Sequence, residues 1–264
     1  MDTQTIQRIG IRAAYRAGRI LNDFFSGSFQ VHKKGAIDLV TDADLASEKA
    51  IVATINESFP DHSFLAEESG ASGTNDRDLW IIDPLDGTTN FAHRLPIFAV
   101  SIAYAHDGQV EVGIVFHPTS GELFTAIRGQ GARLNDQPIR VSSTERMRDS
   151  LLVTGFPYTI ISSGDTAIPL VRFSRCLSAA QGVRRLGSAA LDLCFVACGR
   201  FDGYWEEHLK PWDTAAGMLI AAEAGARVTD FDERPYHIHH PQLLAANPHI
   251  HSDMVALLTI EDAQ

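Results

Sequence analysis

The pattern of apolar residues predicts an amphipathic helix at the start of the chain. Between residues 4 and 25, apolar side chains recur at three- and four-residue spacing, as on one face of a helix. A second helix is expected to run to about residue 58, because Thr41 and Asp42 are both favourable helix N-caps. Its inward face should carry Leu45, Ala46, Ile51 and Ile55.

Short apolar runs predict a sheet after these helices. The runs at 63–66 and 80–82 are typical of buried strands. Three further runs, at 97–104, 110–116 and 122–127, are separated by turn sequences rich in Gly, Asp and Ser. This spacing favours antiparallel hairpins.

The order of predicted elements changes near residue 150, where hairpins are followed by alternating short strands and helices. The later part includes a predicted Ala-rich helix at 214–224 and a final helix at 252–258. No Pro/Ser-rich linker marks the change. We therefore expect two tightly packed domains, over residues 1–150 and 151–264.

The composition is that of an ordinary globular protein with an acidic surface. Of the 264 residues, 45% are hydrophobic and 21% are charged. The net charge of -11 disfavours non-specific binding to nucleic acid. No apolar run approaches the ~20 residues of a membrane span, and the first residues lack the pattern of a signal peptide. These features predict a cytoplasmic protein without a membrane partner.

The cysteines do not predict a disulfide framework. Cys176, Cys194 and Cys198 are few and odd in number, which favours a reducing compartment. Cys194 and Cys198 are four residues apart and share a face if their segment is helical. Half of a zinc site is one interpretation, but no matching Cys or His pair flanks them, so buried small residues are favoured.

One stretch, residues 80–91 with the sequence WIIDPLDGTTNF, combines the end of a strand with two acids and a helix start. Asp83 and Asp86 supply hard oxygen ligands of the kind that Mg²⁺ prefers. The Gly-Thr-Thr step after them begins a helix, whose free N–H groups favour an anion. The alternative is an Asp-Pro turn in which the acids and threonines act only as caps.

Other acids stand at the ends of other predicted elements. Glu67 and Glu68 follow the strand at 63–66, and a strand placed beside Ile81 and Ile82 would bring a carboxylate to the same point. Adjacent glutamates after a strand are otherwise usually solvated.

Two helix starts also carry acids. Asp42 and Asp44 begin the second helix, where the helix dipole alone would favour them. Asp213 opens the Ala-rich helix, where an ordinary N-cap is the alternative. The histidines between His237 and His240 could bind a metal, but a polar loop is the favoured interpretation.

Three segments together resemble the inositol monophosphatase family, a group of metal-dependent, lithium-sensitive phosphatases. They are residues 65–69 (LAEES), 80–91 and 211–213 (PWD), and the similarity extends over nearly the whole chain. The resemblance implies a layered αβαβα sandwich of mixed α/β and α+β character, as in fructose-1,6-bisphosphatases. Residues 1–150 would hold a large, mostly antiparallel sheet with the metal site. Residues 151–264 would hold a smaller mixed sheet and supply Asp213 and substrate contacts.

The resemblance also implies a set of metal ligands. Two to three Mg²⁺ ions would be held by Glu67, Asp83, the carbonyl of Leu85, Asp86 and Asp213. Such a cluster is consistent with elementary electrostatics, because packed carboxylates repel one another and raise their own pKa values unless cations are present. Oxygen ligands and a substrate phosphate favour Mg²⁺ over zinc.

Catalytic and substrate roles follow from the same resemblance. Thr88 and Glu67 would orient the attacking water, and Asp44 would accept a hydrogen bond from Thr88. The residues expected at the substrate are Gly87 and Thr88 at the phosphate, Asp213, and Gly187, Ser188, Ala189 and Glu206 at the alcohol. Lys33 or Lys34 would supply a basic group of an N-terminal loop.

The substrate class is the least specific part of this expectation. Glu206 and the following Leu-Lys-Pro-Trp-Asp run most resemble the inositol phosphatase branch, so myo-inositol 1-phosphate is the expected substrate. Alternatives on the same core are histidinol phosphate, fructose 1,6-bisphosphate and phosphoadenosine phosphates. A non-catalytic binding or scaffold protein is the alternative of another class. The resemblance further implies a homodimer.

Overall fold

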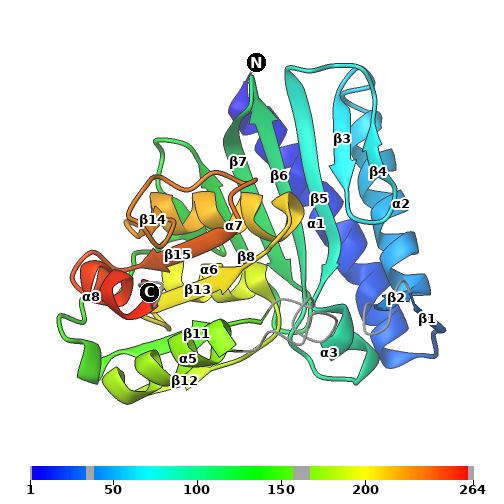
Figure 1. Ribbon diagram of the computed structural model, residues 1–264. Coiled ribbons are helices and arrows are strands. Elements are labelled where there is room, and N and C mark those ends of the chain that lie inside the picture. Colours follow the sequence, from blue (N-terminus) through cyan, green and yellow to red (C-terminus); the bar gives the residue numbers. More distant parts are fainter. Residues whose placement is uncertain (1, 34–38, 157–166, 261–264) are drawn as a thin grey trace.

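The computed structural model describes residues 2–33, 39–156 and 167–260, in which helices and sheets stack as five layers (Figure 1). Helices α1 (Thr3–Ser26) and α2 (Asp42–Asn56) cover one face of an eight-stranded sheet. Helices α6 (Ala189–Ala197) and α7 (Pro211–Glu223) lie between that sheet and a five-stranded one. The outer layer is α5 (Ala167–Ala179) and α8 (His251–Leu258). The expected αβαβα sandwich is confirmed.

The large sheet is antiparallel except where β3 and β5 pair in parallel. Its strand order is β10-β9-β8-β7-β6-β5-β3-β4. In chain order its strands are β3 (Ser63–Ala66), β4 (Gly70–Ser72), β5 (Asp78–Asp86), β6 (Ala99–His106), β7 (Gln109–His117), β8 (Glu122–Ile127), β9 (Ala132–Leu134) and β10 (Gln137–Pro138).

The smaller sheet is mixed, with the order β12-β11-β13-β15-β14. Strand β11 runs parallel to β12 and β13, whereas β15 is antiparallel to β13 and β14. These strands are β11 (Leu151–Thr154), β12 (Gly182–Arg184), β13 (Gly203–Glu207), β14 (Arg227–Thr229) and β15 (Gln242–Ala246). The remaining elements are the pair β1 (Val31–Lys33) and β2 (Leu39–Thr41), the short helix α3 (Thr88–Ala92) and the 3₁₀ turn η1 (Met147–Asp149).

The two sheets share a hydrophobic core through α6 and α7. One buried cluster joins residues of the large sheet to both of these helices and to β13 and β15. Helix α7, from the second part of the chain, packs on β6 and β7. The division of the chain into domains at residue 150 remains a prediction.

Two helices differ from expectation in informative ways. Leu45 was expected to face the core, but it is 51% exposed, whereas Asp44, Ser47 and Glu48 of α2 are buried. The inward face of α2 is therefore partly polar, because it supports loops rather than packing only on apolar side chains. Helix α7 begins at Pro211, three residues before the expected start, since proline suits the first helical turn.

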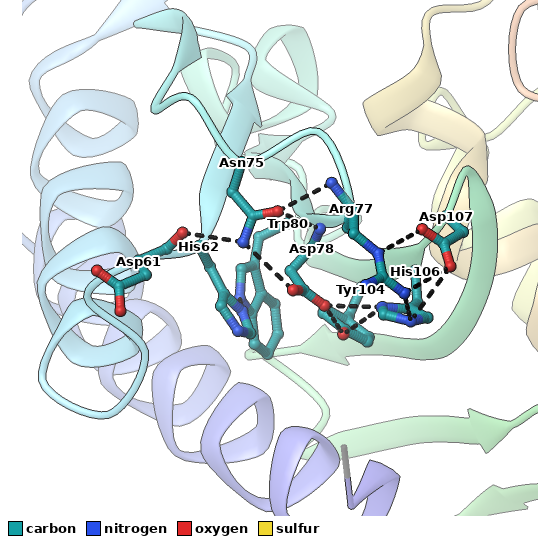
Figure 2. A network of polar contacts seen from close by, with 9 residues as sticks. All are labelled: Asp61, His62, Asn75, Arg77, Asp78, Trp80, Tyr104, His106 and Asp107. Atoms are coloured by element: carbon teal, nitrogen blue, oxygen red, sulfur yellow. Dashed lines mark hydrogen bonds and ion pairs between the residues drawn. The ribbon is translucent and has the colours of Figure 1, made fainter.

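Strand β5 carries a polar network at the end where it begins (Figure 2). The Tyr104 hydroxyl donates to Asp78 Oδ1, and His106 Nδ1 lies 2.8 Å from the same oxygen. The Asn75 amide donates to Oδ2 at 3.2 Å. Burial by itself raises the pKa of Asp78, but these hydrogen bonds outweigh burial and lower the pKa to about 2.

Replacing Asp78 with asparagine is expected to destabilise the fold at neutral pH by about 1–2 kcal/mol, as for a hydrogen bond to a charged group that water still reaches. In the unfolded chain the pKa of this aspartate returns to its ordinary value of 3.8. The carboxylate therefore stabilises the fold above about pH 4, and this contribution is lost as the pH falls toward 2. In urea denaturation, the free energies of unfolding of wild type and Asp78→Asn should converge as the pH is lowered.

Asp107→Asn is the matched control, because Asp107 pairs with Arg77 in the same network but its side chain is 57% exposed. It should cost less stability than Asp78→Asn. The free energy of unfolding of wild type should exceed that of Asp78→Asn by less at pH ~3 than at neutral pH. If this difference were the same at both pH values, the low pKa assigned to Asp78 would be wrong.

Candidate active site

A cavity of about 490 Å³ lies where β5 ends, at the opposite end of that strand from the Asp78 network. In Figure 1, β5 runs down toward α3, and the cavity is lined by residues from the end of β5 and the start of α3. The cavity is lined by segments from both parts of the chain. Its walls include eleven residues singled out from the sequence, namely Glu67, Asp83, Leu85, Asp86, Gly87, Thr88, Gly187, Ser188, Ala189, Glu206 and Asp213.

Parallel pairing of β3 with β5 places two of the acids at one edge of the sheet. Leu65 pairs with Ile81 and Ala66 with Ile82, and the Glu67 N–H donates to the Ile82 carbonyl at 3.1 Å. Because both strands run in the same direction, the residues that follow them meet at the same edge. The expected neighbourhood of the two strands is thus confirmed.

Asp83 and Asp86 are buried and held by different groups. The Leu85 N–H donates to Asp83 Oδ1 at 2.9 Å, and the pairing register with β6 shifts between the two acids. Asp86 Oδ2 accepts hydrogen bonds from the Ser188 hydroxyl at 2.6 Å and the Ala190 N–H at 2.8 Å. The start of α6 therefore fixes Asp86 by direct hydrogen bonds.

The cavity is strongly unfavourable for negative charge. Burial raises the pKa of Asp83 well above its ordinary value, and Glu67, Asp86 and Asp213 raise it further. Burial also raises the pKa of Asp213, with Asp86 and Glu67 adding to it. The pKa of Asp86 rises to about 6, because burial outweighs the hydrogen bonds from Ser188 and Ala190.

These carboxylates suit hard cations, which would neutralise their mutual repulsion. Among the described residues, no three such side chains converge tightly enough to form a ready-made ligand group. The acids instead surround one cavity, as expected of like charges that repel one another. The donor set of carboxylates and the Leu85 carbonyl fits Mg²⁺ in its chemistry.

Thr88 begins α3 and contacts Asp44, the one predicted catalytic residue that does not line the cavity. The Thr88 hydroxyl lies 3.2 Å from Asp44 Oδ1 and 3.0 Å from the Leu85 carbonyl. Asp44 Oδ2 accepts hydrogen bonds from both the N–H and the hydroxyl of Thr41, which closes a capping box at the start of α2. One oxygen of Asp44 thus takes part in capping α2, while the other contacts Thr88.

Asp213 also combines a local role with a place in the cavity. It is the third residue of α7, and its Oδ2 accepts a hydrogen bond from the Lys210 N–H at 2.7 Å. Lys210, not Asp213, is the N-cap of α7, so the N-cap alternative is wrong in position. One oxygen of Asp213 instead closes a capping box with the Lys210 N–H, and the side chain also lines the cavity beside the other acids.

Glu206 also lines the cavity, near the end of β13. The Tyr204 hydroxyl donates to Glu206 Oε2 at 2.6 Å. Burial raises the pKa of Glu206 to about 7, although this hydrogen bond opposes the rise. Ser188, expected at the substrate, is almost fully buried and uses its hydroxyl hydrogen on Asp86.

Several residues that support the site were not singled out from the sequence. Glu48 accepts hydrogen bonds from the N–H groups of Glu68 and Ser69, and Ser47 donates to the Pro84 carbonyl. These contacts explain the polar inward face of α2. A break in the apolar periodicity of α2 was the available signal, because a polar residue on an inward face needs a partner.

Asn90 and Arg185 were also missed. The Asn90 amide donates to the carbonyls of Ile97 and Leu186, which ties α3 to the segment before α6. Arg185 lines the cavity and lowers the pKa values of Asp86 and Glu206. Neither residue stands in a sequence pattern that would reveal its contacts.

The histidine-rich segment His237–His240 contributes no residue to the lining of the cavity. Lys33 ends β1, and Lys34 lies outside the described residues. The His237–His240 segment is a turn between β14 and β15, where His240 Nε2 lies 3.4 Å from Asp230 Oδ2. Cys194 is buried in α6 as expected, and Cys198 is partly buried at its end. No helix in the described parts of the chain is long and apolar enough to cross a membrane.

Comparison with known proteins identifies close relatives over almost the full length. The chain is 45% identical to Nus factor SuhB of Pasteurella multocida, over 92% of this chain and 91% of the relative. It is also 45% identical to inositol-1-monophosphatase of Synechocystis, over 96% of this chain and 88% of the relative.

Solved structures show the same fold. The extragenic suppressor protein suhB of Bartonella henselae superposes with a TM-score of 0.92 at 39% identity, covering 97% of this chain and 98% of that one. Inositol monophosphatase of Anabaena superposes with a TM-score of 0.88 at 43% identity, covering 98% and 96%. The inositol monophosphatase family pattern matches residues 2–262. The chain therefore belongs to the inositol monophosphatase family.

Proposed function

We propose that this protein is a Mg²⁺-dependent phosphomonoesterase that hydrolyses myo-inositol 1-phosphate to inositol and phosphate. One observation carries the proposal: four acids from three separate segments line a single cavity, namely Glu67, Asp83, Asp86 and Asp213. Besides burial, the neighbouring acids raise the pKa values of Asp83 and Asp213. Uncompensated carboxylates would cost stability there. Their placement around one cavity favours a role that requires cations.

The ions would be held by two overlapping groups of ligands. Glu67, Asp83 and the Leu85 carbonyl would hold one Mg²⁺, while Asp83, Asp86 and Asp213 would hold a second. A weaker third ion would use Glu67 and water. When bound, Mg²⁺ supplies positive charge that neutralises the phosphate and lowers the pKa of a water molecule.

The residues around the ions would orient the reacting groups. The Thr88 hydroxyl can donate its hydrogen to Asp44 or to the Leu85 carbonyl, which leaves its oxygen free to accept a hydrogen bond from water. Glu67 would hold the same water from the other side. The N–H groups of Gly87 and Thr88 would contact the phosphate, since the start of α3 favours an anion.

Glu206 favours a polyol as the leaving alcohol. A carboxylate accepts hydrogen bonds from hydroxyl groups, and it would repel a second phosphate placed nearby. Inositol monophosphate is therefore favoured over fructose 1,6-bisphosphate and phosphoadenosine phosphates. Gly187 and Ala189 would complete the contacts with the alcohol, while Ser188 would act through Asp86.

A substrate panel tests the proposal. Phosphate release from inositol 1-phosphate, histidinol phosphate, fructose 1,6-bisphosphate and phosphoadenosine phosphate would be measured with Mg²⁺ and after its removal by a chelator. We expect Mg²⁺-dependent release, fastest from inositol 1-phosphate. A preference of orders of magnitude for histidinol phosphate would overturn the substrate, and no release from any monoester would overturn the enzyme.

A role besides catalysis is named for several relatives, which are called Nus factor SuhB. For this chain the acid cluster favours hydrolysis over a purely non-catalytic scaffold, because a scaffold has no need of four mutually repelling carboxylates. We also propose a cytoplasmic homodimer and sensitivity to lithium, both of which rest on family membership.

A further inference from the structure

The side chain of Glu206 is held in one position by two residues that have no assigned role. Glu206 and Tyr204 are two residues apart on β13, so their side chains lie on the same face of the strand. Tyr204 is fully buried in the core shared by the two sheets, and its hydroxyl donates to Glu206 Oε2 at 2.6 Å. The ring of Tyr204 therefore anchors the carboxylate to a rigid part of the protein.

Gly155 lies directly against the same carboxylate. A Cβ atom added at residue 155 would lie 2.0 Å from Glu206 Oε2 and 2.2 Å from both Cδ and Oε1. Gly155 directly follows β11, which pairs with β13 through Thr154 and Trp205. Gly155 does not adopt the left-handed backbone conformation, so glycine is required here because a larger side chain would clash with the carboxylate.

Several charged side chains act on Glu206, so its position depends on the residues that hold it. Asp192, in the first turn of α6, is 1% exposed, and neither of its carboxylate oxygens has a hydrogen-bond partner among the described residues. Asp192 and Asp86 both act on Glu206 as like charges, whereas Arg185 acts as an opposite charge. The hydrogen bond from the Tyr204 hydroxyl therefore holds the Glu206 carboxylate in place beside these like charges.

We propose that Tyr204 and Gly155 are positioning residues that give the site its preference for polyol phosphates, by fixing Glu206 as an acceptor for hydroxyl groups of the alcohol. This inference rests on the proposed function, because it takes the part of the cavity beside Glu206 to be the place of the alcohol. The phosphate and its cations would be held by other residues of the cavity, so the two halves of the substrate would be recognised separately.

Two substrates distinguish a loss of Glu206 positioning from a general loss of catalytic activity. One is inositol 1-phosphate, and the other is 4-nitrophenyl phosphate, whose leaving group carries no additional hydroxyls. In Tyr204→Phe and in Gly155→Ala, kcat/KM for inositol 1-phosphate should fall about tenfold, as for a lost hydrogen bond to a charged group. For 4-nitrophenyl phosphate it should change less than about threefold. Equal losses on both substrates would overturn the proposal.

Double variants test whether both residues act through Glu206. In a Glu206→Ala background no carboxylate remains to be anchored or displaced. Adding Tyr204→Phe or Gly155→Ala should then cause no further loss of polyol preference. Additive losses would show that these residues act elsewhere. Tyr204→Phe adds no volume, so it keeps the proposal testable if Gly155→Ala does not fold.

Calorimetric binding of inositol 1-phosphate, with Ca²⁺ in place of Mg²⁺ to slow turnover, distinguishes the two proposals. Both variants should bind about tenfold more weakly than wild type. If wild type binds but never hydrolyses the ester, the proposed function fails, while weaker binding in the variants still supports the positioning role. Unchanged binding in the variants, or no binding by wild type, would overturn it.

Discussion

Replacing Asp83 with asparagine is expected to abolish metal-dependent phosphatase activity while leaving the folded protein at least as stable as before. Asp83 is 2% exposed, and Glu67, Asp86 and Asp213 raise its pKa as like charges. A neutral amide at this position removes one charge from that repulsion. It can keep the hydrogen bond from the Leu85 N–H, because the amide oxygen is also an acceptor.

The loss of activity should be about 1000-fold or more. Asp83 would be the ligand common to two ions, and metal ions contribute several kcal/mol of transition-state stabilisation. Each 1.4 kcal/mol corresponds to a factor of about ten in rate. Turnover of inositol 1-phosphate at saturating Mg²⁺ measures this loss, and thermal unfolding without Mg²⁺ measures the stability.

Binding of Mg²⁺ gives a readout that does not depend on turnover. A cation that binds only the folded protein raises its unfolding temperature. Mg²⁺ should do so in wild type and much less in Asp83→Asn. Asp78→Asn is the matched control, since it makes the same chemical change at the other end of β5, five residues away and so about 16 Å at ~3.3 Å per residue. Retention of a tenth of wild-type activity in Asp83→Asn would contradict the assignment.

The sequence predicted the elements of the fold well where periodicity was strong. The first helix was expected at 4–25 and spans Thr3–Ser26, because its apolar face repeats along its whole length. The hairpins from β6 to β8 were also predicted, since their turns carry glycine and aspartate. Helix α2 was placed correctly, and Ile51 and Ile55 are buried as expected, but Leu45 is exposed although it follows the helical period. The side of α2 that faces inward instead carries Ser47, which contacts β5, and Glu48, which contacts the turn after β3.

For the candidate site, the sequence indicated which residues would meet, but not what holds them. Acids next to strand and helix ends are visible as short motifs. Their supports come from residues far away in the chain, such as Ser188 with Asp86, 102 positions apart. Tyr204 illustrates the same limit, because a tyrosine in an apolar strand normally indicates only core packing. Its hydroxyl contact with Glu206 depends on rotamers that no periodicity specifies.

Gly113→Ala is expected to destabilise the protein by about 1–3 kcal/mol or more, although alanine is normally the better residue in a strand. Gly113 of β7 pairs with Ala103 of β6 and Ala126 of β8, so three small residues form a shallow row across the large sheet. The backbone of α7 lies in this row. A Cβ at residue 113 would come within 2.6 Å of the Ala216 carbonyl oxygen and 3.2 Å of its Cα.

The sign of this effect follows from what the new methyl group would meet. Alanine in a strand gains about 0.5–1 kcal/mol over glycine through the unfolded chain, but a helix backbone cannot rotate away as a side chain can. Helix α7 would have to shift as a unit, and Asp213 in its first turn would shift with it. We therefore expect reduced Mg²⁺-dependent activity together with the loss of stability.

Gly182→Ala in the edge strand β12 is the matched control. A Cβ there would meet only the guanidinium of Arg184 at 3.2 Å and a methyl group of Leu151 at 3.6 Å. The flexible arginine can move aside, so this variant should be neutral or slightly stabilising in urea denaturation. Equal stability of Gly113→Ala and Gly182→Ala would contradict this prediction. It would mean that Asp213 is not held at the cavity by close packing of α7 on the large sheet.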